Sequence, residues 1–247
     1  GDISQTPTGA TNGDVTLNLT AIADTGGSGY YRTKLPNGTF VTTTSASEVV
    51  TTNGTYNFVI YDNAGNSTTK SITVSNIDKT APTGTLTQTP SYWTNGNVTL
   101  NLTSIADTGG SGFYSIRLPN GQLVTTPGAS YTVAVNGSYS FTIYDRAGNS
   151  TIKTIWVTNI DRIPPNANLT QTPTDWTNGN VTLNLTSVND SGGSILKNIQ
   201  LPNGTLVTGL SASQVVTTNG SYSFVIYDNA GNSTTKTITV SNIDKTV

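Results

Sequence analysis

Aliphatic and polar residues alternate along short stretches of this chain. In residues 98–103, valine and leucine at the even positions alternate with threonine and asparagine at the odd positions. Successive side chains of a β-strand point to opposite faces, so this pattern predicts a half-buried strand with its aliphatic residues against a core. Helical periodicity is absent along the chain, which is therefore predicted to be all-β.

Six further segments in the middle third of the sequence also have strand character. Turn sequences such as Leu118-Pro119-Asn120-Gly121 separate them, because proline fixes φ while asparagine and glycine tolerate the positive φ of a hairpin. Together with 98–103, the predicted strands are 85–89, 113–118, 122–126, 131–135, 139–145 and 151–158. Seven short strands with frequent turns predict an antiparallel β-sandwich.

The whole pattern returns after 83 residues without insertion or deletion. The alignment is clearest for two sets of aspartates, which are Asp62, Asp145 and Asp228, and Asp78, Asp161 and Asp244. This period is longer than that of solenoid repeats and suits a small domain with its own core. The sequence predicts three domains, at residues 1–80, 81–163 and 164–247, and because both ends fall inside the pattern we expect a longer natural array.

The composition argues against several classes of function. Charged residues make up 10% of the chain, the net charge is -2, and there is no cysteine, histidine or methionine. Without clusters of lysine and arginine, neither nucleic acid nor an anionic membrane is expected as a partner. No run approaches the eighteen apolar residues of a membrane span. Without histidine and cysteine, most hydrolase chemistry lacks its usual metal ligands, nucleophile and general base, so an enzyme is not expected.

Three motifs recur in the repeats, and together they resemble a known family. Residues 137–141 read Gly-x-Tyr-x-Phe, residues 145–149 read Asp-x-Ala-Gly-Asn, and the linker 77–82 reads Ile-Asp-Lys-Thr-Ala-Pro. The first resembles the Gly-x-Tyr-x-Cys that opens strand F of immunoglobulin-type domains, with Phe141 in place of the cysteine. The chain resembles the bacterial immunoglobulin-like (Big-type) tandem repeats of cell-surface proteins, adhesin stalks and S-layer proteins.

This resemblance implies a fold and a contact within it. The fold is three tandem immunoglobulin-like antiparallel β-sandwiches, arranged as an extended rod roughly 120 Å long. In such domains the tyrosine of the motif bonds through its hydroxyl to the backbone upstream. The inter-sheet disulfide and the tryptophan of strand C that mark vertebrate domains are absent from this sequence.

Nine of the thirteen acidic residues occupy three repeated positions. In an immunoglobulin-type sandwich the loops after Asp107 and Asp145 leave the same pole, which the linker carrying Asp78 enters. The resemblance therefore implies that these three carboxylates converge where the first and second repeats meet. The corresponding residues of the next junction are Asp161, Asp190 and Asp228, whereas the first repeat has only the pair Asp24 and Asp62.

Two interpretations of these acids stay open at this stage. Carboxylates about 5 Å apart repel by roughly 3 kcal/mol per pair at an effective dielectric constant of 20, and a calcium ion with its preference for oxygen ligands offsets that repulsion. Calcium at module junctions is also what the resemblance implies. Alternatively, each aspartate accepts backbone N–H groups in a turn, and Lys79 or Arg162 neutralises the linker acid.

The function expected from these features is that of a non-enzymatic stalk or spacer in a bacterial cell-surface protein. We expect an extracellular, monomeric rod at the cell surface or cell wall, which carries other domains toward host or cell-wall glycan or protein. The alternative is an adhesive array whose own repeats contact such partners, and Trp156 is then the candidate ligand contact because the other repeats carry threonine there. A carbohydrate-active enzyme with paired aspartates is disfavoured, since these acids occupy turn positions in every repeat.

Overall fold

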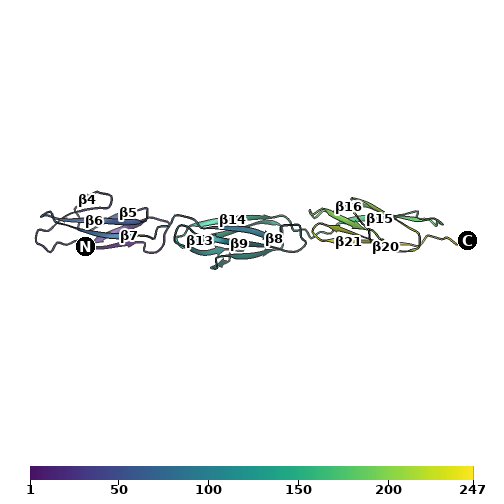
Figure 1. The fold of residues 1–247 in the computed structure, drawn as a ribbon, viewed down its shortest axis with the longest axis horizontal. Coiled ribbons are helices and arrows are strands. Elements are labelled where there is room, and N and C mark those ends of the chain that lie inside the picture. Colours follow the sequence, from purple (N-terminus) through teal and green to yellow (C-terminus); the bar gives the residue numbers. More distant parts are fainter. Residues whose placement is uncertain (247) are drawn as a thin grey trace. The chain divides into compact units, whose positions relative to one another are not determined.

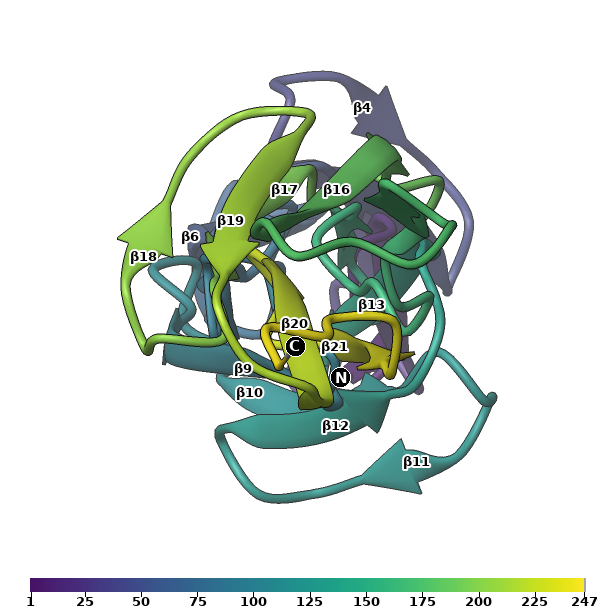
Figure 2. The same cartoon turned by 90° about the vertical axis from the view of Figure 1, so that its right-hand side faces the viewer.

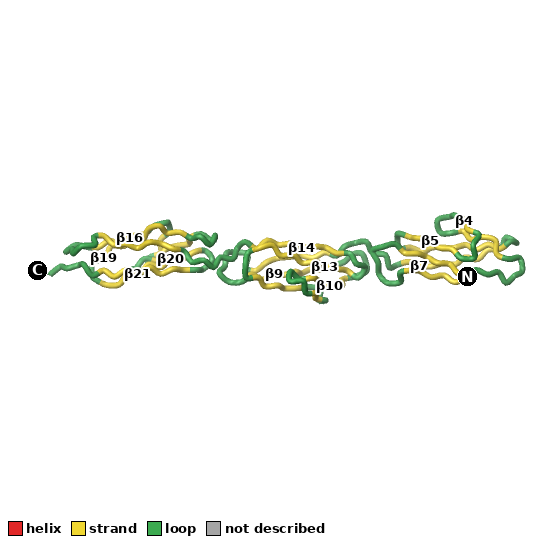
Figure 3. Tube along the Cα trace, turned by 180° about the vertical axis from the view of Figure 1, so that it is seen from behind, coloured by secondary structure: helices red, strands yellow, loops and turns green. Residues whose placement is uncertain are grey.

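The computed structural model describes residues 1–246, which form strands, turns and loops and contain no helix (Figure 3). The strands of the first repeat are β1 (Asp2–Thr6), β2 (Val15–Thr20), β3 (Tyr30–Lys34), β4 (Phe40–Val41), β5 (Ala46–Val50), β6 (Gly54–Asp62) and β7 (Ser67–Val74). Those of the second are β8 (Thr83–Thr89), β9 (Val98–Ala106), β10 (Phe113–Arg117), β11 (Leu123–Val124), β12 (Ala129–Val133), β13 (Gly137–Asp145) and β14 (Ser150–Val157). Those of the third are β15 (Asn166–Thr172), β16 (Val181–Asn189), β17 (Leu196–Gln200), β18 (Leu206–Val207), β19 (Ala212–Val216), β20 (Gly220–Asp228) and β21 (Ser233–Val240) (Figure 1).

The described residues form six antiparallel sheets, two in each repeat. A three-stranded sheet has the orders β1-β2-β5, β8-β9-β12 and β15-β16-β19, and a four-stranded sheet has the orders β4-β3-β6-β7, β11-β10-β13-β14 and β18-β17-β20-β21. The fourth strand of each repeat has only two residues and lies at the outer edge of its own sheet, beside the third strand (Figure 2). The repeated sequence therefore produces the same strand order three times, and the all-β prediction is confirmed.

The Cα packing divides the chain into two compact units. One consists of residues 1–86, 102–129 and 140–154, and the other consists of residues 87–101, 130–139 and those from 155 onward. This division runs through the middle repeat, so the predicted domains at 1–80, 81–163 and 164–247 stay predictions. Among the described residues, none belongs to a helix long and apolar enough to cross a membrane.

The two sheets of a repeat bury a common core. In the third repeat, Val181, Leu183 and Leu185 on β16 are fully buried and pack with Phe224 and Ile226 on β20. The first repeat uses the same positions, and their counterparts in the second repeat are also fully buried, namely Val98, Leu100, Leu102, Phe141 and Ile143. The alternation read from the sequence thus marks the core-facing positions.

The tyrosine contact implied by the Gly-x-Tyr-x-Phe motif is present in all three repeats. The hydroxyl of Tyr139 donates a hydrogen bond of 2.8 Å to the carbonyl oxygen of Val135. Equivalent bonds run from Tyr56 to Thr52 at 2.7 Å and from Tyr222 to Thr218 at 2.8 Å. Each bond fixes the turn that leads into the longest strand of the four-stranded sheet, which ends at one of the repeated aspartates.

Each predicted strand of the middle repeat has an observed counterpart whose bounds differ by one to three residues, and for two of them a local contact explains the difference. The segment 122–126 shortens to β11, because Thr126 and Gly128 form a local turn through hydrogen bonds of 2.8 and 3.0 Å. The strand predicted at 131–135 begins at Ala129 and ends at Val133. It ends early because the carbonyl of Val135 accepts the tyrosine hydroxyl and belongs to the turn.

Exposure predicts opposite outcomes for two aromatic substitutions in the middle repeat. Phe141 is fully buried whereas Trp156 is 71% exposed. Phe141→Ala should lower the free energy of unfolding of this repeat by about 3–5 kcal/mol, since it removes a ring from the core. Trp156→Ala should change it by no more than about 0.5 kcal/mol. Hydrogen exchange of peptides from β9 and β13 measures both effects, and equal loss of protection in the two variants would contradict the assigned core.

Candidate metal centre

Acidic side chains gather in two clusters. Each cluster contains three aspartates, and one carboxylate oxygen from each lies within 4.8 Å of the other two. The first cluster is Asp78, Asp107 and Asp145, and the second is Asp161, Asp190 and Asp228. The convergence implied by the family resemblance is therefore confirmed, while the binding of a metal is a separate question.

The repeat that precedes Asp78 holds the backbone of this residue. The N–H of Asp78 donates to the carbonyl of Thr11 at 2.8 Å, and Ile77 forms a parallel bridge with Thr11. The side-chain amide of Asn53 bonds to both the N–H and the carbonyl of Ile77, at 2.9 and 2.8 Å. Equivalent asparagines, Asn136 and Asn219, hold the later linkers in the same way. The linker thus continues the fold of the first repeat.

The side chain of Asp78 contacts the repeat that follows. It is only 4% exposed, and its Oδ2 accepts the N–H of Ser111 at 2.9 Å. Its Oδ1 accepts the N–H of Thr80 at 2.9 Å, and its carbonyl accepts the side-chain amide of Asn149, also at 2.9 Å. A single residue is therefore hydrogen-bonded to both neighbouring repeats.

Asp107 folds the glycine-rich loop that faces Asp78. Its Oδ1 accepts the N–H of Gly109 at 3.1 Å, and its Oδ2 accepts the N–H of Gly112 at 2.6 Å and the hydroxyl of Ser111 at 3.3 Å. Gly112 has a φ of 80°, which side chains rarely adopt. The loop also passes so close to the linker that a Cβ on Gly109 would overlap the carboxylate of Asp78. Glycine is thus required by the close approach of linker and loop.

Asp145 completes the first cluster from the end of β13. It is 2% exposed, and its two carboxylate oxygens accept the backbone N–H and the side-chain amide of Asn149 at 2.8 and 2.7 Å. The same amide bonds to the carbonyl of Asp78. Asn149 therefore connects two of the three acids. The Asp-x-Ala-Gly-Asn motif had suggested a turn at this position and not this connection.

The second cluster repeats this arrangement with one change. Asp161 accepts the N–H groups of Ser194 and Ile163, at 2.9 and 3.0 Å, and Asn232 bridges it to Asp228. The change is at Ile195, which occupies the position of Gly112 and has a φ of 59°. A β-branched residue in this left-handed conformation costs roughly 1–3 kcal/mol.

The pKa values of the two linker aspartates lie below that of an ordinary aspartate. For Asp78, burial raises the pKa, but hydrogen bonds from Ser111 and from the N–H of Thr80 together outweigh it. For Asp161, burial likewise raises the pKa, but the hydrogen bonds from Ser194 and from the N–H of Ile163 together lower it by more. Both carboxylates are consequently anionic at neutral pH.

The clusters meet the chemical requirements of a calcium site. Calcium–oxygen distances of about 2.3–2.6 Å place two ligands of one ion at most about 5 Å apart, which agrees with carboxylate oxygens that lie within 4.8 Å. The carboxylate oxygens of Asp78 and Asp145 each accept one hydrogen bond and keep a further lone pair, whereas Oδ2 of Asp107 accepts two and Oδ1 accepts one. Three carboxylates supply part of a six- to eight-coordinate shell, and water supplies the remainder in many such sites. Oxygen-only ligands suit hard cations and not zinc or copper.

The first repeat has an incomplete version of the same arrangement. Asp24 accepts N–H groups of Gly26 and Gly29, and Asp62 accepts those of Ala64 and Asn66. The pKa of Asp24 is lowered chiefly by those two glycine N–H groups, against the opposing effects of desolvation and, to a smaller extent, of Asp62. Within residues 1–246 no third acid joins this pair.

Trp156, the predicted ligand contact, lies on β14 with its side chain in solvent. Its outward orientation agrees with the threonines found at this position in the other repeats. Its role in binding stays a prediction.

Comparisons with known proteins are sparse. No family model matches the chain, and no curated protein matches it. Among solved structures, a chain from a structural study of a 1.5-MDa bacterial ice-binding adhesin has a TM-score of 0.48 and 20% sequence identity, and the match covers 94% of this chain and 91% of that solved chain. The glucan-utilisation protein SGBP-B of Bacteroides ovatus has a TM-score of 0.23 and 16% identity, covering 98% of this chain and 67% of that one. Latent PorU of Porphyromonas gingivalis has a TM-score of 0.22 and 12% identity, and the match covers 94% of this chain and 32% of that one. At these scores and identities the neighbours do not indicate what this chain binds or does.

Two matched glycine substitutions test the close approach at the first cluster. Gly109 and Gly26 occupy the same position in identical loop sequences, but only Gly109 faces a linker carboxylate. Gly109→Ala should displace Asp78 and increase hydrogen exchange at Ser111 and Asn149, whereas Gly26→Ala should have a much smaller effect in its own loop. Equal effects of the two substitutions would show that Asp78 does not pack against the loop.

The lowered pKa values predict how stability depends on pH. A carboxylate with a depressed pKa stabilises the folded state fully above its unfolded-state pKa of about 3.9, and this contribution is lost as the pH falls through the lower folded-state value. The melting temperature should therefore stay constant from pH 7 to about 5 and fall below about 4. A double variant, Asp78→Asn with Asp161→Asn, should show a smaller fall in calorimetry, and an unchanged acid profile would contradict the prediction.

Proposed function

We propose that this chain is a non-enzymatic spacer of a bacterial cell-surface protein, and that calcium stiffens the junctions between its repeats. The observation that carries the proposal is the hydrogen bonding of Asp78 and Asp161. Each has its backbone bonded to the repeat before it and its side chain bonded to the repeat after it. A linker held at both ends is what a spacer of defined length requires.

A second contact supports the same function at each junction. The N–H of Asn12 in the first repeat donates to the carbonyl of Ala147 in the second, at 3.0 Å, and Asn95 and Ala230 form the same bond at the next junction. Both contacts involve loops at the ends of strands, so neither contact uses the hydrogen-bonding edge of a sheet. The same surface pairing can therefore recur wherever the 83-residue pattern is repeated.

The repeats fit an immunoglobulin-like sandwich of the bacterial type. The tyrosine contact of strand F is present three times, and a fully buried phenylalanine stands where a disulfide cysteine would be. The two-residue fourth strand pairs with the third strand, a departure from the constant-type domain in which the fourth strand joins the other sheet. We place these sandwiches in an extended, monomeric rod.

Calcium would act on the charge of each cluster. Ionised carboxylates with oxygens within 4.8 Å of one another repel by about 3 kcal/mol per pair at an effective dielectric constant of 20. An ion that binds all three removes this repulsion and connects the linker to two loops of the following repeat. The free energy of binding then adds to the stability of the junction.

A spacer role agrees with the chemistry that the chain lacks. The aspartates of the clusters have their oxygens engaged by backbone and amide N–H groups, and the sequence contains no histidine or cysteine to act beside them. Solubility rests on threonine, asparagine and serine with few charges, as in long extracellular β-arrays. We therefore place the protein outside the cell, at the bacterial surface or cell wall.

Calcium titration of the full chain tests the proposal. Titration calorimetry should detect two ions per chain, one at each complete cluster, and scattering should give a longer maximum dimension with calcium than with EDTA. Asp107→Asn should abolish one of the two sites. The matched control is Asp24→Asn, which alters the identical loop of the first repeat and should leave both sites intact.

Two results would refute this mechanism. The first is the absence of binding heat at millimolar calcium together with the same maximum dimension in EDTA. The second is equal loss of calcium in the Asp107 and Asp24 variants, because the linker acid would then have no part in the site.

A further inference from the structure

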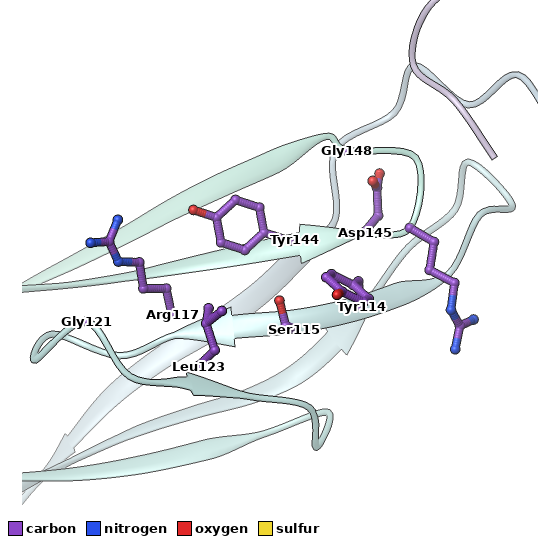
Figure 4. Close-up of a pocket in the computed structure, with 9 residues that line it drawn as sticks. Tyr114, Ser115, Arg117, Gly121, Leu123, Tyr144, Asp145 and Gly148 are labelled. Carbon is purple, nitrogen blue, oxygen red and sulfur yellow. The ribbon is translucent and has the colours of Figure 1, made fainter. Parts of the chain in front are cut away.

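The middle repeat has an open groove on the outer face of its four-stranded sheet. The groove has a volume of about 650 Å³, within the range of small-molecule sites. Tyr114, Leu123 and Tyr144 provide its apolar surface, and Arg117 and Arg146 also line it. Figure 4 shows Ser115 between the two tyrosines, with Arg117 toward the end of the groove that lies away from Gly148. None of these residues was singled out by the sequence analysis as a binding site.

Strand register explains how these side chains come together. Ser115 on β10 pairs with Tyr144 on β13, and Arg117 pairs with Leu123 on β11. Ile116, between Ser115 and Arg117, faces the core and is fully buried, so its two neighbours face outward. Tyr114 is 59% exposed and lies beside a register shift in β10. Ser115 lines the floor of the groove and is itself only 3% exposed, so the larger side chains around it form most of the accessible surface.

The first repeat shows what this arrangement of rings can accommodate. Arg32 occupies the position of Ser115 there, and its guanidinium lies over three aromatic rings. The distances from its central carbon to the ring centres are 4.0 Å for Phe40, 5.0 Å for Tyr31 and 5.5 Å for Tyr61. In the first repeat, the planar guanidinium of Arg32 thus covers the aromatic surface of the sheet. The middle repeat has serine at this position and leaves the corresponding surface free.

The third repeat lacks the same set of groups. Asn198 replaces the serine, and Lys197 stands where the middle repeat has Tyr114. The hollow there is smaller, about 310 Å³, and Gln200 replaces Arg117. The combination of two tyrosines, a small floor residue and two arginines is therefore specific to the middle repeat.

The charge of the groove indicates an anionic ligand. The one salt bridge among residues 1–246 joins Lys79 to Asp14, so Arg117 and Arg146 have no acidic partner. The nearest carboxylate in the lining, Asp145, is buried and has both oxygens bonded to Asn149. Two guanidinium groups without an acidic partner, beside the exposed ring of Tyr114 and the half-buried ring of Tyr144, favour a ligand with a flat apolar face and a carboxylate.

We propose that the groove of the middle repeat binds a sugar ring that carries a carboxylate group, such as a uronic acid in an acidic glycan. The C–H face of the sugar stacks on a tyrosine ring, and the carboxylate forms paired hydrogen bonds with a guanidinium. An acidic peptide fits less well, because β10 is hydrogen-bonded to β11 and β13 on its two sides and offers no free edge to a peptide backbone. This activity is additional to the spacer role and does not depend on calcium.

The test uses the full chain and a defined probe. In the presence of EDTA, which excludes calcium bridges to the sugar, trigalacturonate should shift the NMR signals of β10 and β13 amides at millimolar concentration. Added salt should weaken this binding because the arginines are exposed. The comparison probes are neutral maltotriose and triglutamate, and both should bind much more weakly.

Substitutions taken from the other repeats provide matched variants. Ser115→Arg fills the groove as Arg32 does in the first repeat, and it should weaken trigalacturonate binding about tenfold or more while the fold is kept. Arg117→Gln combined with Arg146→Asn introduces the residues of the third repeat and should remove the preference over maltotriose. Asn198→Arg, the same change in the third repeat, should have no effect on binding.

Several outcomes would overturn the assignment. Unchanged binding in Ser115→Arg would place the sugar elsewhere on the chain. Maltotriose bound as tightly as trigalacturonate would show that the arginines do not select an anion. Triglutamate bound more tightly than trigalacturonate would identify the surface as a site for acidic peptides. The calcium experiments above are unaffected by any of these results.

Discussion

A buried, ionised aspartate in the linker is the interaction on which the connection between repeats depends. Asp78 and Asp161 are almost completely buried, which raises their pKa values, yet hydrogen bonds from Ser111 and Ser194 and from backbone N–H groups hold these pKa values below that of an ordinary aspartate. Burying an anion is costly unless it is paired or hydrogen-bonded, so the surrounding loop must supply donors at fixed positions. The serine and glycine residues of that loop meet this requirement, because Ser111 and Ser194 donate and Gly109 and Gly192 leave space for the carboxylate. The linker and the loop therefore constrain each other.

The same constraint concentrates negative charge. Two further aspartates are needed to fold the loops around the linker acid, and each brings its carboxylate within 4.8 Å of the others. Backbone donors stabilise each anion separately but do not remove the repulsion between anions. Hydrogen bonding and cation binding are thus not competing explanations of the clusters. The first accounts for the positions of the acids, and the second accounts for how three of them can be close together.

Much of the fold could be predicted from the sequence, because the signals for it are local. Alternating residues such as those of 98–103 mark the buried face of β9, and the Gly-x-Tyr-x-Phe motif marks the turn before β13. The convergence of Asp78, Asp107 and Asp145 followed from the resemblance alone, since the three are far apart in the chain. The bridging amide of Asn149 was missed because its contact with Asp78 depends on the packing of two repeats. The start of β12 at Ala129 was also missed, because it follows directly from the turn that Thr126 and Gly128 form.

The groove illustrates a different limit of sequence reasoning. Serine at position 115 has no significance until its neighbours on two adjacent strands are known, and the register that places Tyr144 and Leu123 beside it includes an irregularity. The residues that form the junction hydrogen bonds are the same at both clusters, namely the linker aspartate, the loop serine and the bridging asparagine. The outer face of the four-stranded sheet is not constant in this way, and there Arg32, Ser115 and Asn198 differ at one position. A repeated scaffold with constant ends and variable faces can therefore acquire a binding site in one repeat without altering the way the repeats are joined.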